Sequence, residues 1–299
     1  MENVLLYLIT VLIWGSTWFA ITYQLNVSPE LSVAYRFFIA SALLFAYSKF
    51  RGLNLRFSIK EQLFIAFEGL LLFSANYILV YYSELHIASG LVSVLFTVVT
   101  IMNVIFSAIF LGIPISSRVV LGSVIGILGV VLIFRPEVEG FQLADGALLG
   151  LIFVLVSALS ASLGNVVAAR NQRNSLPVIQ TNAYGMLYGA IATFAIALVR
   201  GVPLAFDFSA PYIISLLYLA LFGSVIAFGA YLTLLGRVGP DRSGYVAVLF
   251  PVVALLLSSL FESLHMDPLQ FLGVALVLLG NGIVLYRRQR SLTAVAAAK

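Results

Sequence analysis

Ten long apolar stretches, separated by short breaks that are charged or rich in proline and glycine, dominate the sequence. A transmembrane helix needs about 20 apolar residues to cross a hydrocarbon core of about 30 Å, and most of the stretches approach that length. They cover residues 4–23, 30–50, 62–83, 88–111, 119–134, 147–169, 177–199, 211–235, 243–261 and 268–286. The pattern therefore predicts an all-α integral membrane protein with ten transmembrane helices.

Composition supports a bilayer as the solvent of this chain. Of its 299 residues, 62% are hydrophobic and 9% are charged, against about 45–50% and about 25% in an average soluble domain. The chain has no cysteine and two histidines, His86 and His265, which leaves little for a metal site or a thiol nucleophile. No phosphate-binding loop, nucleophile–base spacing or basic stripe is present. We expect no cofactor, no enzymatic activity and no nucleic-acid partner.

The basic residues predict the orientation, because loops on the cytoplasmic side carry the excess of Lys and Arg. With both termini in the cytoplasm, 13 of the 16 basic residues fall on the inner side: Lys49, Arg51, Arg56, Lys60, Arg118, Arg170, Arg173, Arg237, Arg242, Arg287, Arg288, Arg290 and Lys299. The acids show the opposite bias, and eight of them are expected outside: Glu30, Glu84, Glu137, Glu139, Asp145, Asp207, Glu262 and Asp267. The amino terminus carries Glu2 and no basic residue before its apolar run, unlike a cleavable signal peptide.

The two halves of the sequence repeat each other. A shift of 154 residues lays residues 89–99 on residues 243–253 with eight identities in eleven positions. The same shift pairs Gly69 with Gly223 and Tyr77 with Tyr231. The repeating unit contains five helices, and an odd-numbered unit must insert its second copy upside down, as in many alternating-access transporters. We expect repeats over residues 1–137 and 138–290, followed by a cytoplasmic tail at 291–299.

Several short motifs resemble those of the drug/metabolite transporter superfamily, specifically its ten-helix EamA-type members. Residues 14–18 (WGSTW) look like the early tryptophan–glycine motif of the family, and Arg36-Phe37 resembles its arginine-containing turn. Phe261-Glu262, followed by Gly273 and Gly280, resembles the acidic helix end that precedes a glycine-rich last helix. The first repeat departs from this pattern, because Leu111 stands where the glutamate would be.

The resemblance implies a central cavity walled by the first four helices of each repeat, with the fifth and tenth helices at the periphery. It also implies export, and the chain is similar in size and aromatic content to YddG-type exporters of aromatic amino acids. Glycines and a nearly apolar composition in the fifth helix favour a packing role for it. Those glycine faces permit either a monomer or a homodimer.

Aromatic pairs spaced by four residues share one helix face and occur on the proposed cavity helices. Tyr81 could instead belong to the aromatic belt at the membrane interface, as could Trp18. Buried asparagines could contact substrate or could tie helices together. The candidate substrate-binding residues are Trp14, Asn76, Tyr77, Tyr81, Asn165, Asn182, Tyr184, Tyr188 and Tyr245.

Ionisable and helix-breaking residues inside the apolar stretches are candidates for coupling or gating. Glu68 could couple transport to protons, or could be a packing contact near the inner mouth. Arg36 could bind a substrate carboxylate, or could pair structurally with an acid such as Glu262. Gly90, Gly244 and Pro251 could supply bends, and the glycines could equally allow close packing.

The sequence thus predicts a secondary transporter of a bacterial-type inner membrane. We expect it to export small amphipathic metabolites, with aromatic or hydrophobic amino acids favoured, by alternating access. An alternative is proton-coupled efflux of organic cations or drugs, carried by Glu68 and cation–π contacts. An intramembrane enzyme and a passive channel are further alternatives that the sequence favours less.

Overall fold

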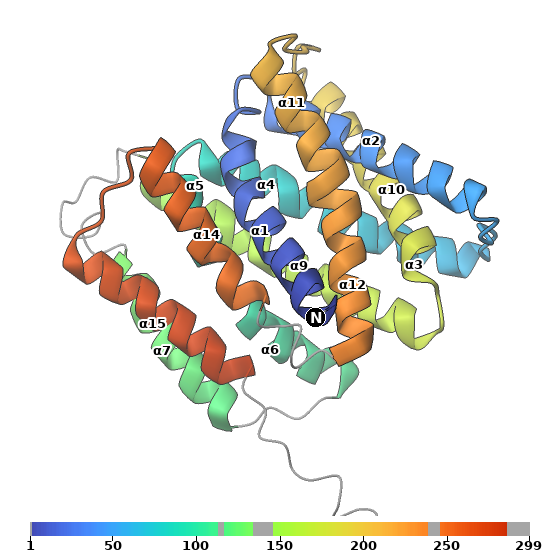
Figure 1. Ribbon diagram of the computed structural model, residues 1–299. Helices are drawn as coiled ribbons and strands as arrows, with labels where there is room; N and C mark the ends of the chain where they lie inside the picture. Colours follow the sequence, from blue (N-terminus) through green and yellow to red (C-terminus); the bar gives the residue numbers. More distant parts are fainter. Residues whose placement is uncertain (1, 113–116, 134–145, 239–245, 286–299) are drawn as a thin grey trace, which may run out of the picture.

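The computed structural model of the chain describes residues 2–112, 117–133, 146–238 and 246–285. Every regular element within these ranges is helical. The first half contains α1 (Glu2–Thr22), α2 (Pro29–Phe50), α3 (Ile59–Gly69), the π-helical segment η1 (Leu70–Ala75), α4 (Asn76–Glu84), α5 (Ser89–Phe96), α6 (Val99–Leu111) and α7 (Ser117–Ile133). The second half contains α9 (Ala147–Arg173), α10 (Val178–Val199), α11 (Ala210–Tyr218), the π-helical segment η3 (Leu219–Ile226), α12 (Ala227–Val238), α14 (Val246–Phe261) and α15 (Pro268–Leu285) (Figure 1).

The lengths of these helices match a bilayer. In the described ranges, seven helical spans are long and apolar enough to cross a membrane, and three shorter apolar helices accompany them. Three of the seven spans combine elements: α3, η1 and α4 form one span, α5 and α6 another, and α11, η3 and α12 a third. The predicted all-α class is confirmed, whereas the count of ten transmembrane helices stays a prediction.

Local sequence explains where several helices begin. Pro29 occupies the first turn of α2, where a missing N–H leaves no hydrogen bond unmade. At the start of α3, Ser58 and Glu61 form a capping box in which the Ser58 Oγ accepts from the Glu61 N–H and Glu61 accepts from the Ser58 N–H. These caps replace backbone hydrogen bonds that the first helical turn cannot make.

The first helix of each half packs into the other half, an arrangement that we call the exchange of first helices. α1 packs mainly against α12 and α14 of the second half, and α9 packs mainly against α4 and α6 of the first. Two further contacts join equivalent helices, α2 with α10 and α7 with α15. This reciprocal pattern is expected if the halves are copies of one unit.

The α7–α15 pair lies at one side of the bundle (Figure 1) and is held by glycines. A Cβ atom added to Gly129 would lie 2.5 Å from the Gly273 carbonyl oxygen, and one added to Gly280 would lie 2.5 Å from that of Gly122. Backbones this close tolerate no side chain, which is how small residues associate helices in lipid.

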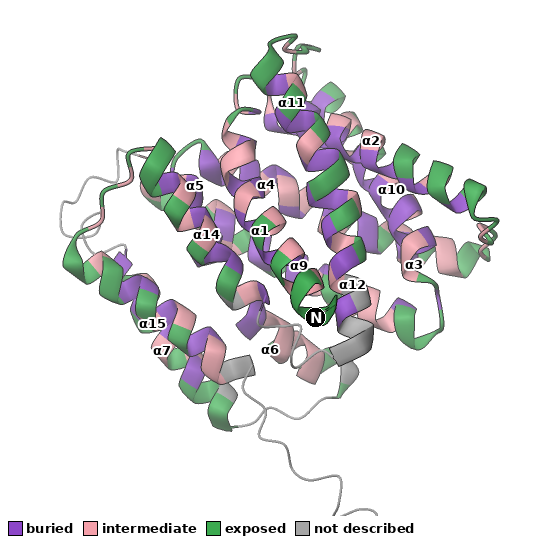
Figure 2. Cartoon of the chain, in the orientation of Figure 1, coloured by how far each residue is buried: buried purple, intermediate pink, exposed green. Residues whose placement is uncertain are grey.

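The outer faces of the bundle are apolar. α7 exposes Val120, Leu121, Val124, Ile127, Leu128 and Val131, and Figure 2 shows exposed residues recurring along α7 and α15. In water such a continuous apolar surface would be unfavourable. In a bilayer it contacts lipid tails, and the polar side chains face the interior.

Candidate functional site

Trp14 lies where α1 packs against the second half of the chain. Its indole ring contacts the rings of Phe228 and Tyr231 on α12, at centroid distances of 5.2 and 5.1 Å. Its Nε1–H donates a 3.3 Å hydrogen bond to the backbone carbonyl of Gly223 in η3. The polar edge of the ring is therefore satisfied while its faces remain apolar.

From Phe228, ring contacts continue across the bundle. Phe228 contacts Phe73 in η1 at 6.1 Å, Phe73 contacts Phe37 on α2 at 5.3 Å, and Phe37 contacts Tyr77 on α4 at 4.8 Å. We call this connected set the aromatic chain: Tyr231, Trp14, Phe228, Phe73, Phe37 and Tyr77. It brings together two of the predicted site residues, Trp14 and Tyr77.

Both π-helical segments adjoin the aromatic chain and fall at related positions of the repeat. η1 begins directly after Gly69, and η3 contains Gly223, its partner at the 154-residue shift. In each π-helical segment, a backbone carbonyl accepts a hydrogen bond from the first helix of the other half. The Gly223 carbonyl in η3 accepts from Trp14 on α1, and the Leu71 carbonyl in η1 accepts from Ser160 Oγ on α9 at 2.8 Å. π-helical turns recur at functional sites. Sequence reasoning missed them, because an apolar run carries no signal for an i→i+5 turn.

Arg36 is buried beside the end of the aromatic chain, with 1% of its surface exposed. Its guanidinium carbon lies 4.6 Å from the centroid of the Tyr77 ring, and its Nε donates a 3.2 Å hydrogen bond to Ser224 Oγ in η3. Its Nη1 has no hydrogen-bond partner among the described residues. The predicted alternative of a pair with Glu262 is not observed, because Glu262 binds Ser89 instead: the Ser89 Oγ donates to Glu262 Oε2 at 2.7 Å.

Two further polar side chains on α4 are buried near Arg36. Tyr81 is fully buried and Glu84 is 8% exposed. Neither the Tyr81 hydroxyl nor either carboxylate oxygen of Glu84 has a hydrogen-bond partner in the part of the chain that the structure describes. Glu84 was expected among the acids on the outer side; its side chain is buried in the bundle, and the side of the membrane on which it lies stays a prediction. Within the same ranges, no group of three or more His, Asp or Glu side chains could hold a metal ion.

Glu68 is buried on α3, at the end of the bundle that the charge pattern predicts to be cytoplasmic. The Asn171 Nδ2 on α9 donates a 2.7 Å hydrogen bond to Glu68 Oε2, and Arg170 Nη1 donates to Asn171 Oδ1 at 3.1 Å. The Arg170 guanidinium also lies over the Phe64 ring, at 3.4 Å. Glu68 thus joins α3 to α9 through a polar network, an arrangement compatible with both predicted roles.

The opposite, predicted outer end holds a second polar network. Arg200, which follows α10, pairs with the buried Glu30 on α2, and Tyr82 on α4 donates to Glu30 Oε1 at 2.8 Å. Arg200 Nη1 also donates to the Tyr82 hydroxyl at 2.7 Å. This hydrogen bond and the charge of Glu30 raise the pKa of Arg200 above its usual value, so the guanidinium stays charged. The network connects α2, α4 and α10 at this end.

α5 and α14 pack closely against each other at the predicted outer end. Besides the Ser89–Glu262 hydrogen bond, Gly90 lies against α14, where an added Cβ would come within 2.7 Å of Ser258 Cβ. Trp18 on α1 contacts Phe96 at the end of α5 and Phe250 on α14, with ring centroids 5.4 and 6.0 Å away. Gly90 thus lies at a close contact between helices, its predicted role in bending stays a prediction, and Trp18 is buried inside the bundle.

Tyr184 and Tyr188 lie apart from the aromatic chain. The Tyr184 hydroxyl donates to the Leu55 carbonyl at 3.1 Å, and the Tyr188 hydroxyl donates to Gln62 Oε1 at 2.8 Å. Both partners belong to the segment that leads into α3 or to its first turn. These tyrosines fix α10 against that segment, and their predicted contact with substrate stays a prediction.

Two of the three predicted asparagines, Asn76 and Asn165, connect helices. Asn76 on α4 donates to the Leu72 carbonyl at 3.2 Å and accepts from Ser157 Oγ on α9 at 2.9 Å. Asn165 on α9 donates to Asn103 Oδ1 on α6 at 3.2 Å. Asn182 is buried on α10.

Pro251 lies inside α14, which continues past it, whereas the equivalent position in the first half, Thr97, marks a break between α5 and α6. Asn281 on α15 donates to Thr97 Oγ1 at 2.8 Å and to the Val277 carbonyl at 3.0 Å.

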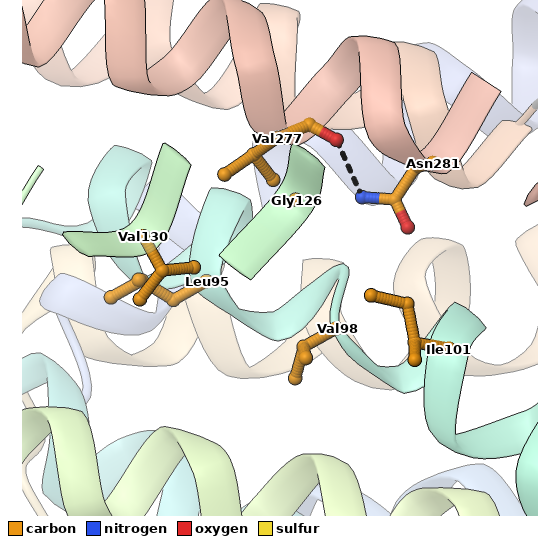
Figure 3. A pocket seen from close by; sticks show the side chains of 7 residues that line it. All are labelled: Leu95, Val98, Ile101, Gly126, Val130, Val277 and Asn281. Atoms are coloured by element: carbon orange, nitrogen blue, oxygen red, sulfur yellow. Dashed lines mark hydrogen bonds between the residues drawn. The ribbon is translucent and has the colours of Figure 1, made fainter. Parts of the chain in front are cut away.

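A cavity of about 10 Å³ lies beside the break between α5 and α6, lined by Leu95, Val98, Ile101, Gly126, Val130, Val277 and Asn281 (Figure 3). It has room for roughly one water molecule and lies between α5, α6, α7 and α15, away from Arg36. The other predicted hinge, Gly244, and Tyr245 lie outside the described residues.

Comparison with known proteins places this geometry in context. A family model described as the EamA-like transporter family matches residues 2–135 and again residues 148–286. The "Uncharacterized inner membrane transporter YedA" of Escherichia coli (strain K12) is 30% identical over 269 residues, which cover 89% of this chain and 85% of that protein. The "Probable amino-acid metabolite efflux pump" of the same strain is 25% identical over 292 residues, with 92% of each chain covered. A solved crystal structure shares the fold with a TM-score of 0.69 at 20% identity, over 97% of this chain and 99% of that one.

Proposed function

Because the chain belongs to the EamA-like transporter family, we propose that it is a secondary transporter that exports small amphipathic metabolites by alternating access. Aromatic or hydrophobic amino acids are the favoured substrates. The observation that carries this proposal is the aromatic chain that ends at the buried Arg36. An apolar side chain would contact the rings, and a polar group of the substrate would reach the charged end. The name of the E. coli amino-acid metabolite efflux relative agrees with this class of substrate.

The architecture proposed for this activity is two inverted repeats of five helices, over residues 1–137 and 138–290, with both termini and the 291–299 tail in the cytoplasm. The double match of the family model supports two repeats. The reciprocal exchange of α1 and α9 supports their structural equivalence. Inverted repeats can exchange conformations about a shared midplane site, which provides alternating access. We propose a bacterial-type inner membrane as the location, in either a monomer or a homodimer.

The structure also suggests which end opens during the cycle. Contacts close the predicted outer end at two places: the Glu30–Tyr82–Arg200 network, and the packing of α5 on α14 with its Ser89–Glu262 hydrogen bond. We propose that both break when substrate leaves the cell. Each consists of a few hydrogen bonds between helices, which allows rigid-body separation without loss of helix structure.

A counterflow assay tests the proposed function. Purified protein is placed in liposomes preloaded with unlabelled phenylalanine, methionine or threonine, and uptake of the labelled amino acid is followed with and without a pH gradient. We expect saturable accumulation without a gradient, because exchange through one carrier needs no other driving force. No saturable exchange of any amino acid would contradict the proposal, and liposomes without protein provide the control.

A second candidate function, proton-coupled efflux of organic cations or drugs, is favoured by the buried Glu68. For Glu68→Gln we expect loss of the pH-gradient-driven component while counterflow exchange is retained, because the amide cannot exchange a proton. One pH unit supports about tenfold accumulation for each coupled proton, so the loss is of that order. Gradient-driven uptake of a labelled organic cation and of phenylalanine measures the effect.

Glu61→Gln is the matched control, because Glu61 lies on the same helix and caps its first turn. If Glu68→Gln and Glu61→Gln both transport like the unmodified protein, Glu68 has no role in coupling. Its hydrogen bond with Asn171 would then join α3 to α9 only.

A further inference from the structure

Three buried polar side chains beside the aromatic chain have unused hydrogen-bonding capacity. Among the described residues, Arg36 Nη1, the Tyr81 hydroxyl and both carboxylate oxygens of Glu84 lack a partner at ordinary hydrogen-bond distance and angle. Each is more than nine-tenths buried. A buried polar group without a partner is costly, and a buried charge more so. Each such group calls for an explanation, and a bound ligand that completes it is one.

The three groups share one place in the fold. Tyr77, Tyr81 and Glu84 are spaced at i, i+4 and i+7 and so lie along one face of α4. The Arg36 guanidinium lies over the Tyr77 ring, and α2 packs against α4. Arg36 interacts with the Tyr81 hydroxyl through its charge and at near-hydrogen-bonding range, and with Glu84 through its charge alone. The guanidinium and the carboxyl group are therefore close enough to interact electrostatically.

A direct Arg36–Glu84 ion pair would explain these residues without a ligand, but it is not formed. Nε of Arg36 donates to Ser224, and both carboxylate oxygens of Glu84 lack a hydrogen-bond partner among the residues described. Glu262, the other acid that interacts with Glu84, accepts hydrogen bonds from Ser89. The site thus presents donors at one end and an acceptor pair at the other, and each end needs a complementary charge.

We propose that Arg36, Tyr81 and Glu84 form a receptor for the charged backbone of a zwitterionic α-amino acid. The substrate carboxylate accepts hydrogen bonds from Arg36 Nη1 and the Tyr81 hydroxyl, and the substrate ammonium donates to Glu84. The amino-acid side chain then lies toward Tyr77 and the aromatic chain. This inference rests on the proposed transport function and specifies which part of the substrate is recognised.

The receptor predicts a selectivity that an aromatic cavity alone does not. A ligand with both charges satisfies both ends, whereas an amine leaves Arg36 and Tyr81 unpartnered and a carboxylic acid leaves Glu84 unpartnered. A hydrogen bond to a charged group accounts for roughly tenfold to a hundredfold in affinity. We therefore expect phenylalanine to compete at least tenfold better than phenethylamine or 3-phenylpropionate for counterflow of labelled phenylalanine in proteoliposomes.

Single substitutions test the two ends of the receptor separately. Glu84→Gln is expected to raise the KM for phenylalanine about tenfold or more and to remove the discrimination against 3-phenylpropionate, which lacks the ammonium group. Tyr81→Phe, which removes one hydroxyl, is expected to weaken the discrimination against phenethylamine and to leave that against 3-phenylpropionate intact. Glu61→Gln at the opposite end of the bundle is the control for both, and size-exclusion chromatography in detergent reports folding.

The outcomes separate this inference from the function on which it rests. If the unmodified protein exchanges phenylalanine but phenethylamine or 3-phenylpropionate competes equally well, the receptor is wrong and the transport function stands. The same conclusion follows if folded Glu84→Gln and Tyr81→Phe proteins keep the full discrimination. Absence of any amino-acid exchange by the unmodified protein overturns both. The wild-type competition decides the question even if a variant fails to fold.

Discussion

Replacement of Gly129 by alanine is expected to destabilise the protein by about 1–3 kcal/mol, the range typical of overpacking. The added methyl group would lie 2.5 Å from the Gly273 carbonyl oxygen and 2.7 Å from the Val277 backbone nitrogen. Both atoms belong to the backbone of α15, so rotation of a side chain cannot relieve the contact and the helices must separate. The free energy of unfolding, measured by SDS titration in mixed micelles, checks this expectation.

The matched control is Gly282→Ala on α15, where an added methyl group would meet no atom within 4 Å. Because alanine has the higher helix propensity, this change should be neutral or stabilising by up to about 1 kcal/mol. Of the two substitutions, only Gly129→Ala should therefore destabilise the protein. Equal effects would mean that the α7–α15 pair does not depend on close backbone contact.

The second large effect is expected for Trp14→Ala, which removes a link in the aromatic chain. The change deletes ring contacts with Phe228 and Tyr231 and the hydrogen bond to the Gly223 carbonyl. If substrate binds along this chain, its ring loses the contact with Trp14 and the well-packed neighbouring ring that Trp14 holds in place. Two aromatic contacts contribute about 1–3 kcal/mol, which corresponds to roughly fivefold to 150-fold in affinity. The KM for phenylalanine counterflow should rise within that range.

Two other substitutions make the Trp14 result specific. Trp14→Phe keeps an aromatic ring without the indole N–H and should give an intermediate KM. Tyr47→Ala removes an exposed aromatic side chain from α2 and should leave the KM unchanged. If Trp14→Ala folds and transports phenylalanine with the wild-type KM, the aromatic chain is not part of the substrate site.

The sequence was most informative where a long-range pattern reflects the bilayer or the repeat. Apolar length identified the membrane helices, because the hydrocarbon core requires it. The repeat aligned Gly69 with Gly223, and the structure places both at π-helical segments. Aromatic spacing identified Trp14 and Tyr77, which the aromatic chain connects.

Residues near helix ends were harder to interpret, because their surroundings depend on tertiary packing. Glu30 and Glu84 look like interfacial acids in the sequence, yet both are buried among helices of the bundle. Tyr184 and Tyr188 have the same i, i+4 spacing as Tyr77 and Tyr81, but their hydroxyls bind the segment at the start of α3. Spacing determines which side chains share a face, and only the packing of helices determines what that face contacts.

The exchange of first helices has a consequence for biosynthesis. α1 leaves the ribosome well before the helices that it contacts most, because α12 and α14 end at Val238 and Phe261. During translation, Trp14 therefore faces lipid or other early helices until most of the chain has been inserted. The first half alone cannot complete its own interior, so a truncated chain should be recognised by quality-control proteases as unfinished. We therefore expect the interior of the bundle to be completed only after most of the helices have been inserted.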